Sequence, residues 1–265
     1  MAERIGVIGT GEMGSGVGGH LAAHGAEVWI SLHGRSAASV ERVAKTGMTV
    51  VDGMLPLARE CEFVLSIVPP ERALAVAGEF ADALRGSGCR PLYIDCNAIA
   101  PQTARAVGGI VTAAGARFVD ASIIGASPSE SGKSPRFHVC GPHVAEANAL
   151  KERGLTILPL AGEIGIASAL KMCWAGIGKA YIGIGAAMFE YAEKLGIADE
   201  LMAEFTKRPK TVAEYLPPET VRMYRKAYRW VGEMREIATF SDDFPAVSEI
   251  YDGLAGYYEN VAKRP

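Results

Sequence analysis

The chain has 265 residues, a formal net charge of −3 and 22% charged residues. That length suffices for one large domain or two smaller ones, each with a proper hydrophobic core. The small net charge argues against a nucleic-acid-binding surface and against an acidic tail.

The cysteine and histidine residues carry no binding pattern. The five cysteines are scattered and lack C-x-x-C spacing, which indicates reduced thiols and no disulfide framework. The five histidines have no metal-ligand spacing, so no metal is expected.

The N-terminus enters a strand directly, without a signal peptide, and no stretch has the composition of a membrane span. We therefore expect a soluble cytoplasmic protein.

The first strand and the turn after it carry the most specific motif. An apolar run over residues 4–8 is followed by Gly9-Thr10-Gly11-Glu12-Met13-Gly14. A G-x-G-x-x-G turn between a strand and a helix is a dinucleotide-binding fingerprint. Gly9 permits the tight turn, Gly11 lets the backbone approach a pyrophosphate, and Gly14 allows close packing of helix on strand. The helix start offers unpaired N–H groups to the anion; the alternative is a plain structural turn.

The turn after the second expected strand, residues 27–32, predicts which cofactor binds. An NAD-specific unit has an acidic residue near this point to hold the ribose 2′-OH. Arg35 and Ser36 stand there instead, and a guanidinium fork with a hydroxyl suits a phosphate. We therefore expect NADP(H). Alternatively, Arg35 is a solvated loop residue and Ser36 caps the following helix; for Ser36 both roles are compatible.

Strands and helices alternate up to residue 162. The further strands are expected at residues 48–51, 63–68, 92–95, 118–121, 136–140 and 155–158, and the helices between them at 37–46, 53–60, 71–84, 101–113 and 143–153. This alternation predicts a Rossmann-type, doubly wound, mostly parallel sheet. Ligands of such sheets lie at the carboxyl ends of strands. The loops at 68–70, 96–101 and 122–128 are therefore expected at the site.

The pattern becomes helical from residue 163. One long helix is expected over residues 164–195, with further helices at 199–206, 211–216, 219–240 and 247–262, separated by Pro209, Pro217-Pro218 and Pro245. We expect an NADP-binding domain over 1–162 and an all-helical substrate and dimerisation domain over 163–265. The small residues of the long helix allow another helix to approach closely, and this apolar domain predicts a homodimer.

Together these motifs resemble the β-hydroxyacid dehydrogenase superfamily, which includes hydroxyisobutyrate and 6-phosphogluconate dehydrogenases and the imine reductases. Met13 matches the G-x-G-x-M-G turn of that superfamily, and residues 120–125 are similar to its substrate loop. Lys171 stands at the position of its catalytic lysine on the long helix. The resemblance implies a Rossmann domain joined to an all-helical domain, with a second subunit often completing the pocket.

The closer similarity is to a branch of 6-phosphogluconate dehydrogenase-like NADP-binding proteins with a C-terminal helical domain of unassigned function. The similar stretches cover nearly the whole chain: residues 32–36, 95–101, 120–125, 170–172 with Lys179, and 228–234. Two positions depart from the better-known dehydrogenases. Their asparagine four residues after the lysine is Ala175 here, and in the substrate loop Ile124 and Ala126 replace a serine and a glycine.

Lys171 is the expected general acid or base. Hydride transfer needs a group that exchanges a proton with the adjoining oxygen or nitrogen of the substrate. Desolvation in an apolar helix disfavours the charged form of a lysine, which suits it to proton exchange. Its neighbours three and four residues away on the helix carry no acid. The alternative is that Lys171 reaches solvent or pairs with a carboxylate from elsewhere.

The remaining site residues are expected around this lysine. Asn97 bonds the substrate or the nicotinamide ribose, or else it caps the helix that begins near residue 101. Ser122 offers a hydroxyl or simply forms a turn. Lys179 lies two helical turns beyond Lys171, where it binds an anionic substrate group or pairs with Glu190, Glu193 or an acid of a second subunit.

The resemblance adds Ile124 and Gly125 to the substrate-binding residues. Val68 and Pro69 are expected to shape the nicotinamide pocket by rigidity. The sequence thus predicts an NADP(H)-dependent oxidoreductase acting on a small hydroxy acid, keto acid or imine. The alternative is a module that senses NADPH or a metabolite without turnover.

Overall fold

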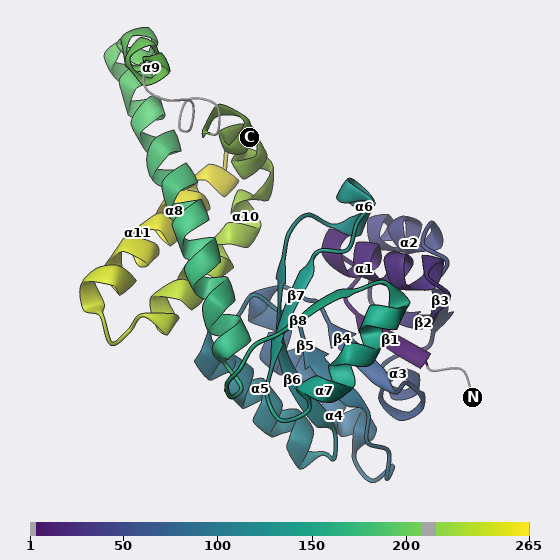
Figure 1. The fold of residues 1–265 in the computed structure, drawn as a ribbon. Helices are drawn as coiled ribbons and strands as arrows, with labels where there is room; N and C mark the ends of the chain where they lie inside the picture. Colours follow the sequence, from purple (N-terminus) through teal and green to yellow (C-terminus); the bar gives the residue numbers. More distant parts are fainter. Residues whose placement is uncertain (1–3, 208–215, 265) are drawn as a thin grey trace. The chain divides into compact units, whose positions relative to one another are not determined.

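The computed structural model describes residues 4–207 and 216–264 (Figure 1). The chain divides into two compact units between Lys171 and Met172. The division lies inside a long helix, whereas the sequence places it ahead of that helix, at residue 162. The start of the helix belongs to the first unit because it is bonded to the sheet, as described below.

One eight-stranded sheet forms the centre of the first unit. Its strands follow the order β3-β2-β1-β4-β5-β6-β7-β8, in which all neighbours are parallel except the antiparallel pair β6 and β7. The order reverses between β1 and β4. The strands are β1 Arg4–Ile8, β2 Glu27–Ser31, β3 Thr49–Val51, β4 Phe63–Ser66, β5 Leu92–Asp95, β6 Arg117–Ile124, β7 Arg136–Cys140 and β8 Thr156–Pro159. The predicted Rossmann-type, mostly parallel sheet is confirmed.

Helices cover both faces of this sheet (Figure 1). One core contains side chains of α1 Glu12–Ala23, α2 Ala37–Ala44 and the short α7 Val144–Ala147 with the 3₁₀ turn η2 Asn148–Arg153. The core on the opposite face contains side chains of α3 Leu55–Glu60, α4 Ala73–Leu84 and α5 Pro101–Ala113. A 3₁₀ turn, η1 Pro70–Arg72, precedes α4, and α6 Pro128–Ser131 packs on α1.

The second unit is helical. It contains most of α8 Ile166–Leu195, together with α9 Ala198–Thr206, α10 Leu216–Phe240 and α11 Pro245–Ala262. Two glycines of α8 face tyrosines of α11: a Cβ on Gly176 would lie 3.0 Å from Tyr251 Oη, and one on Gly183 would lie 2.7 Å from Tyr258 Oη. The small residues of α8 therefore serve a helix contact within one chain.

Three local expectations differ from the structure. β6 extends to Ile124, so residues 122–124 are strand and the loop begins at Gly125. The predicted helix at 143–153 is a short α-helix followed by a 3₁₀ turn. Pro217 and Pro218 lie in the first turn of α10, where a missing N–H costs nothing. The predicted helix at 211–216 lies, apart from Leu216, outside the described residues. No helix in the described ranges has the length and apolarity needed to cross a membrane.

A buried carboxylate attaches the start of α8 to the sheet. Asp120 of β6 has no exposed surface. Its Oδ2 accepts hydrogen bonds from Gly165 N at 2.8 Å and Ser168 N at 3.2 Å, and its Oδ1 accepts one from Ser168 Oγ at 2.7 Å. The thiol of Cys140, opposite on β7, donates to Oδ2 at 3.2 Å. Asp120 is therefore a tertiary N-cap, and its charge also favours the positive end of the helix dipole.

We predict that Asp120→Ala lowers the free energy of unfolding by about 2–4 kcal/mol, because it leaves several buried donors without an acceptor. Ser168→Ala, the matched control, removes one of these donors and is expected to cost about 1 kcal/mol. Urea denaturation of both variants measures the difference. A loss in Asp120→Ala no larger than that in Ser168→Ala would contradict the capping role.

Candidate cofactor and substrate site

The three fingerprint glycines have the geometry that a dinucleotide requires. Gly9 has a φ of +135°, and a Cβ there would lie 2.0 Å from the carbonyl oxygen of Ile67. A Cβ on Gly14 would lie 2.3 Å from the Gly9 carbonyl oxygen. A Cβ on Gly11 would meet no described atom within 4 Å, so the backbone there is open to a ligand. The turn thus fits a pyrophosphate at the start of α1.

The Thr10 carbonyl oxygen fixes the orientation of this turn. It accepts hydrogen bonds from Ser15 Oγ at 3.1 Å and from Arg42 Nη1 at 2.8 Å. In a trans peptide the following N–H points the opposite way, so the Gly11 N–H is directed away from these partners. Sequence reasoning missed Arg42, because its contact joins residues 32 positions apart and no local pattern indicates it.

Arg35 and Ser36 lie in the turn between β2 and α2. Ser36 is the N-cap of α2: its Oγ accepts from Ser39 N at 3.4 Å. The capping alternative for Ser36 is therefore present, and it does not preclude a phosphate contact. Arg35 is exposed, and its guanidinium bonds no other described residue. The choice of NADP(H) over NAD(H) stays a prediction.

Asn97 holds the loop that contains Val68 and Pro69. Its Oδ1 accepts from Val68 N at 2.7 Å, and its Nδ2 donates to Asp95 Oδ2 at 2.9 Å and to Ser66 Oγ at 3.2 Å. Its residue surface is only 2% exposed. The capping alternative is wrong, since the N-cap of α5 is Ala100. Asn97 thus positions the loop; a direct contact between Asn97 and a ligand stays a prediction.

Asp95 completes this buried polar cluster. It has no exposed surface, and its Oδ1 accepts from Asn97 N at 3.0 Å. It pairs in register with Asp120 of the neighbouring strand. Burial, with a smaller contribution from the charge of Asp120, raises the pKa of Asp95 to about 7, and the hydrogen bonds from Asn97 oppose the rise.

Lys171 binds the part of β6 that extends beyond β5. β5 ends at Asp95, opposite Asp120, so among the described strands none pairs with the last residues of β6 on that side. There the half-buried Lys171 donates from Nζ to the carbonyl oxygen of Ile123 at 2.8 Å. The chain then turns at Gly125, where φ is +135°. The alternatives for Lys171 were solvent or a distant carboxylate, and a strand carbonyl was not among them.

The loop after β6 contacts the glycine-rich turn between β1 and α1. Ser127 Oγ donates to the Glu12 carbonyl oxygen at 3.0 Å, and α6 packs along α1. Ser122 and Ile124, both buried, lie on β6 itself and not in this loop. The structure therefore joins Lys171, the end of β6 and the cofactor turn within the first unit.

Lys179 lies in the second unit and forms an ion pair there. Its Nζ donates to Glu233 Oε2, and the two side chains are 12% and 10% exposed. The ammonium also lies 5.4 Å from the centroid of the Trp230 ring. Glu190, one of the predicted partners, instead binds Arg264 with Nη1–Oε1 at 2.9 Å. The predicted pairing of Lys179 with Glu190 or Glu193 is wrong, since its partner is Glu233, 54 positions away along the chain. An acid of a second subunit or an anionic substrate group near Lys179 stays a prediction.

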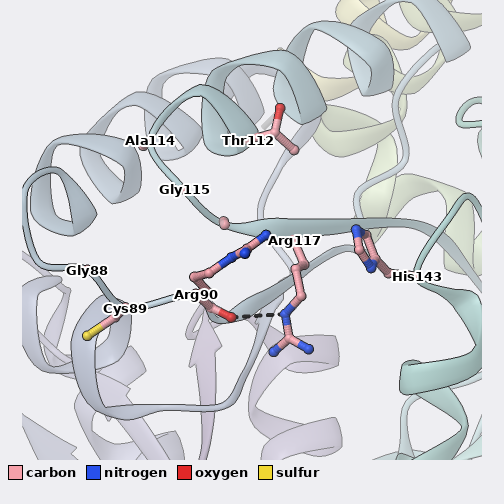
Figure 2. A pocket seen from close by; sticks show the side chains of 9 residues that line it. Gly88, Cys89, Arg90, Thr112, Ala114, Gly115, Arg117 and His143 are labelled. Carbon is pink, nitrogen blue, oxygen red and sulfur yellow. Dashed lines mark hydrogen bonds between the residues drawn. The ribbon is translucent and has the colours of Figure 1, made fainter.

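A surface cavity of about 480 Å³ lies at the opposite edge of the sheet, around the amino ends of β5 and β6 (Figure 2). Arg90, Thr112, Arg117 and His143 are among the residues that line it. Arg117 Nε donates to the Arg90 carbonyl oxygen at 2.9 Å, and its guanidinium pairs with Glu146. These polar groups serve the local structure, and the cavity is separate from the carboxyl-end site.

The sheet order, the fingerprint geometry and the helix start define a dinucleotide-binding protein of the Rossmann class. The family model for the NAD binding domain of 6-phosphogluconate dehydrogenase matches residues 4–143, more than half of the chain, and the chain belongs to this family. Residues 192–261 match a domain of unknown function, DUF1932. This combination confirms the predicted β-hydroxyacid dehydrogenase superfamily with a C-terminal helical domain.

Relatives with known and unknown roles agree with this assignment. The chain is 29% identical to an uncharacterized 28.5 kDa protein of Methanothermus fervidus, over 75% of this chain and 74% of that one. It is 28% identical to the mitochondrial 3-hydroxyisobutyrate dehydrogenase of Drosophila melanogaster, over 57% of this chain but only 45% of the dehydrogenase. The chain thus matches less than half of the length of that enzyme.

Solved structures extend the similarity across the chain. A conserved protein of unknown function, described as structurally similar to 3-hydroxyacid dehydrogenases, is 27% identical, with a TM-score of 0.69 over 98% of this chain and 99% of that one. The 3-hydroxyisobutyrate dehydrogenase of Mycobacterium tuberculosis is 20% identical, with a TM-score of 0.73 over 99% and 94%. The latter shares the fold.

The raised pKa of Asp95 predicts a pH-dependent stability. The folded state retains a proton that the unfolded chain releases near pH 4, so stability from this group is greatest below that pH and is lost as pH rises to about 7. The unfolding free energy of wild type minus that of Asp95→Asn should therefore fall between about pH 5 and about pH 8, by up to about 1.4 kcal/mol per pH unit. Urea titrations across this range measure it. If this difference in unfolding free energy stays constant across the pH range, the pKa of Asp95 in the folded protein is an ordinary one.

Proposed function

We propose that the protein is an NADP(H)-dependent oxidoreductase that transfers a hydride between nicotinamide and a small hydroxy acid or keto acid, with Lys171 as the general acid or base. The observation that carries this proposal is the bond from Lys171 Nζ to the Ile123 carbonyl oxygen at 2.8 Å. It keeps the amino group of Lys171 on the strand whose loop contacts the cofactor turn. The dehydrogenases among the relatives support the same reaction class.

The residues divide the chemistry as follows. NADP(H), when bound by the residues below, would supply the hydride chemistry. In the oxidative direction, the neutral Lys171 amine takes the hydroxyl proton of the substrate as the C–H hydride leaves; in the reductive direction, Lys171 returns that proton to the carbonyl oxygen. The carbonyl oxygen of Ile123 orients the Nζ. Gly9–Gly14 holds the pyrophosphate, and Asn97 keeps the Val68–Pro69 loop in place.

The preference for NADP(H) belongs to this proposal. Arg35 is exposed at the end of β2, with a guanidinium that no described residue binds. A planar guanidinium fork suits the 2′-phosphate, and no acidic residue in this turn competes for the ribose.

A homodimer through the helical unit is also proposed. Large apolar side chains on α8 remain exposed at positions 174, 177, 181 and 184, with Ile177 at 73% and Ile184 at 53%. Their spacing of three and four residues places them along one stripe of the helix. A second chain that covers this stripe would remove that apolar surface from water.

We predict that Lys171→Met folds and binds NADPH but loses turnover by at least about 100-fold, because no proton donor replaces the amine. The test is a turnover screen that follows NADPH consumption with keto acids and cyclic imines, and NADPH formation from NADP⁺ with sugar acids, run in parallel with NADPH titration. Lys171→Arg is the control that retains a charge but not an amine that deprotonates.

Three results of the screen are informative. Near-normal turnover by Lys171→Met would remove Lys171 from the mechanism. Turnover of cyclic imines alone would move the proposal to imine reduction. Tight NADPH binding without turnover of any compound would favour the sensing module.

We predict that Arg35→Ala weakens NADPH binding roughly tenfold and leaves NADH binding unchanged, because only NADPH carries the 2′-phosphate. Arg42→Ala is the matched control. It frees the Thr10 carbonyl oxygen and should weaken both cofactors alike. Fluorescence titration measures the four dissociation constants. An unchanged NADPH constant in Arg35→Ala would overturn the phosphate contact.

A further inference from the structure

Ser122 and His138 face one another across the antiparallel pair β6 and β7. Residues directly opposite on such a pair project to the same face of the sheet, with Cβ atoms about 5 Å apart. Ser122 has no exposed surface, and His138 is half-buried. The polar side chains of Ser122 and His138 are therefore neighbours on this face of the sheet.

Neither side chain has its buried polar atom satisfied by the protein. Among the described residues, Ser122 Oγ and His138 Nδ1 have no hydrogen-bond partner, and they do not bond each other. Leaving such a group unsatisfied costs about 1–3 kcal/mol, and buried polar atoms are rarely left so. The adjoining pair on the same face, Asp120 and Cys140, is bonded to the start of α8 and to each other.

The unsatisfied pair adjoins Lys171. Asp120 and Ser122 are two apart on β6 and so share a face, the one that the start of α8 covers. Lys171 follows Ser168 by three residues, about one helical turn, and donates to the carbonyl oxygen of Ile123, the residue after Ser122. His138 keeps partial exposure, and its β8 neighbour Leu158 is 36% exposed, so this end of the face borders solvent.

The chemistry of the pair selects one kind of ligand group. Burial, and then the charge of Arg136, lowers the pKa of His138 below its usual value, which favours the neutral imidazole at pH 7. A neutral imidazole nitrogen accepts or donates one hydrogen bond, and a serine hydroxyl can do the converse. A carboxylate only accepts and prefers charged donors. A hydroxyl both donates and accepts, and so satisfies both atoms at once.

From this juxtaposition we infer that Ser122 Oγ and His138 Nδ1 form a subsite beside Lys171 that binds a second hydroxyl of the substrate. The inference rests on the proposed function and narrows it to small acids with a hydroxyl besides the reacting one. That hydroxyl donates to His138 Nδ1 and accepts from Ser122 Oγ.

The test compares two acids that differ by one hydroxyl, glycerate and 3-hydroxypropanoate. Their dissociation constants are measured by ligand-observed NMR with the protein saturated in NADP⁺. Wild type should bind glycerate about tenfold more tightly, as expected for a hydroxyl that satisfies buried partners. Ser122→Ala and His138→Phe should each reduce this ratio to about one, with the constant for 3-hydroxypropanoate unchanged within about twofold.

Controls separate the subsite from folding. Thr156→Ala, which removes a polar side chain from the neighbouring strand β8, should keep the wild-type ratio. Ser122→Ala deletes a single oxygen atom, so it tests the subsite even if His138→Phe folds poorly. The NADPH dissociation constant of every variant reports an intact fold.

The outcomes are distinct from those of the proposed function because binding, and not turnover, is measured. No preference in wild type, no binding of glycerate, or a preference that survives both substitutions would overturn the subsite and leave the two atoms to a bridging water. If the substitutions abolish the preference for glycerate, but neither the wild type nor any variant turns over a substrate, the subsite stands and the proposed oxidoreductase activity is rejected.

Discussion

The carboxylate of Asp120 joins the elements that carry the candidate chemistry. A charge with no exposed surface is costly unless donors surround it, and Asp120 is met by Gly165 N, Ser168 N, Ser168 Oγ and the Cys140 thiol. These donors come from β7 and from the start of α8. Since Lys171 lies one turn beyond Ser168, the cap fixes where the lysine meets β6. The position of the proposed acid or base thus depends on a buried carboxylate of the sheet.

Asp95, the neighbour of Asp120 in the sheet, is equally buried but has different hydrogen-bond donors. Its donors come mainly from Asn97, and burial raises its pKa to about 7. Two adjacent buried carboxylates repel each other when both are charged, so one that protonates more readily relieves the repulsion. Asp95 accepts two hydrogen bonds from Asn97, and the Asn97 amide oxygen accepts from Val68 N in the loop. The ligand end of the sheet is therefore built on buried, hydrogen-bonded polar groups.

Local features of the fold and site were predictable from sequence, and distant contacts were not. The close packing at Gly9 and Gly14 and the open backbone at Gly11 agree with the tasks predicted for them, because a turn of six residues defines its own geometry. The bonds from Arg42 to Thr10 and from Lys179 to Glu233 were missed, since each joins residues on different elements. The length of β6 was underestimated because its pairing with β7 decides where it ends, and residues 122–125 resemble a loop in isolation.

That longer strand changes what the departures from the superfamily mean. Ile124 stands where the resembled dehydrogenases have a substrate-binding serine, and in this chain it is a buried strand residue. Ser122 lies two residues earlier on the same face of β6, about 6.5 Å back along the strand. The hydroxyl of Ser122 therefore lies one same-face position closer to Asp120 than a serine at position 124 would. Its cross-strand neighbour on β7 is His138. Under the proposed subsite, this hydroxyl with the histidine beside it would favour a substrate of different shape, since hydrogen bonds to a hydroxyl discriminate more strongly than apolar contacts do.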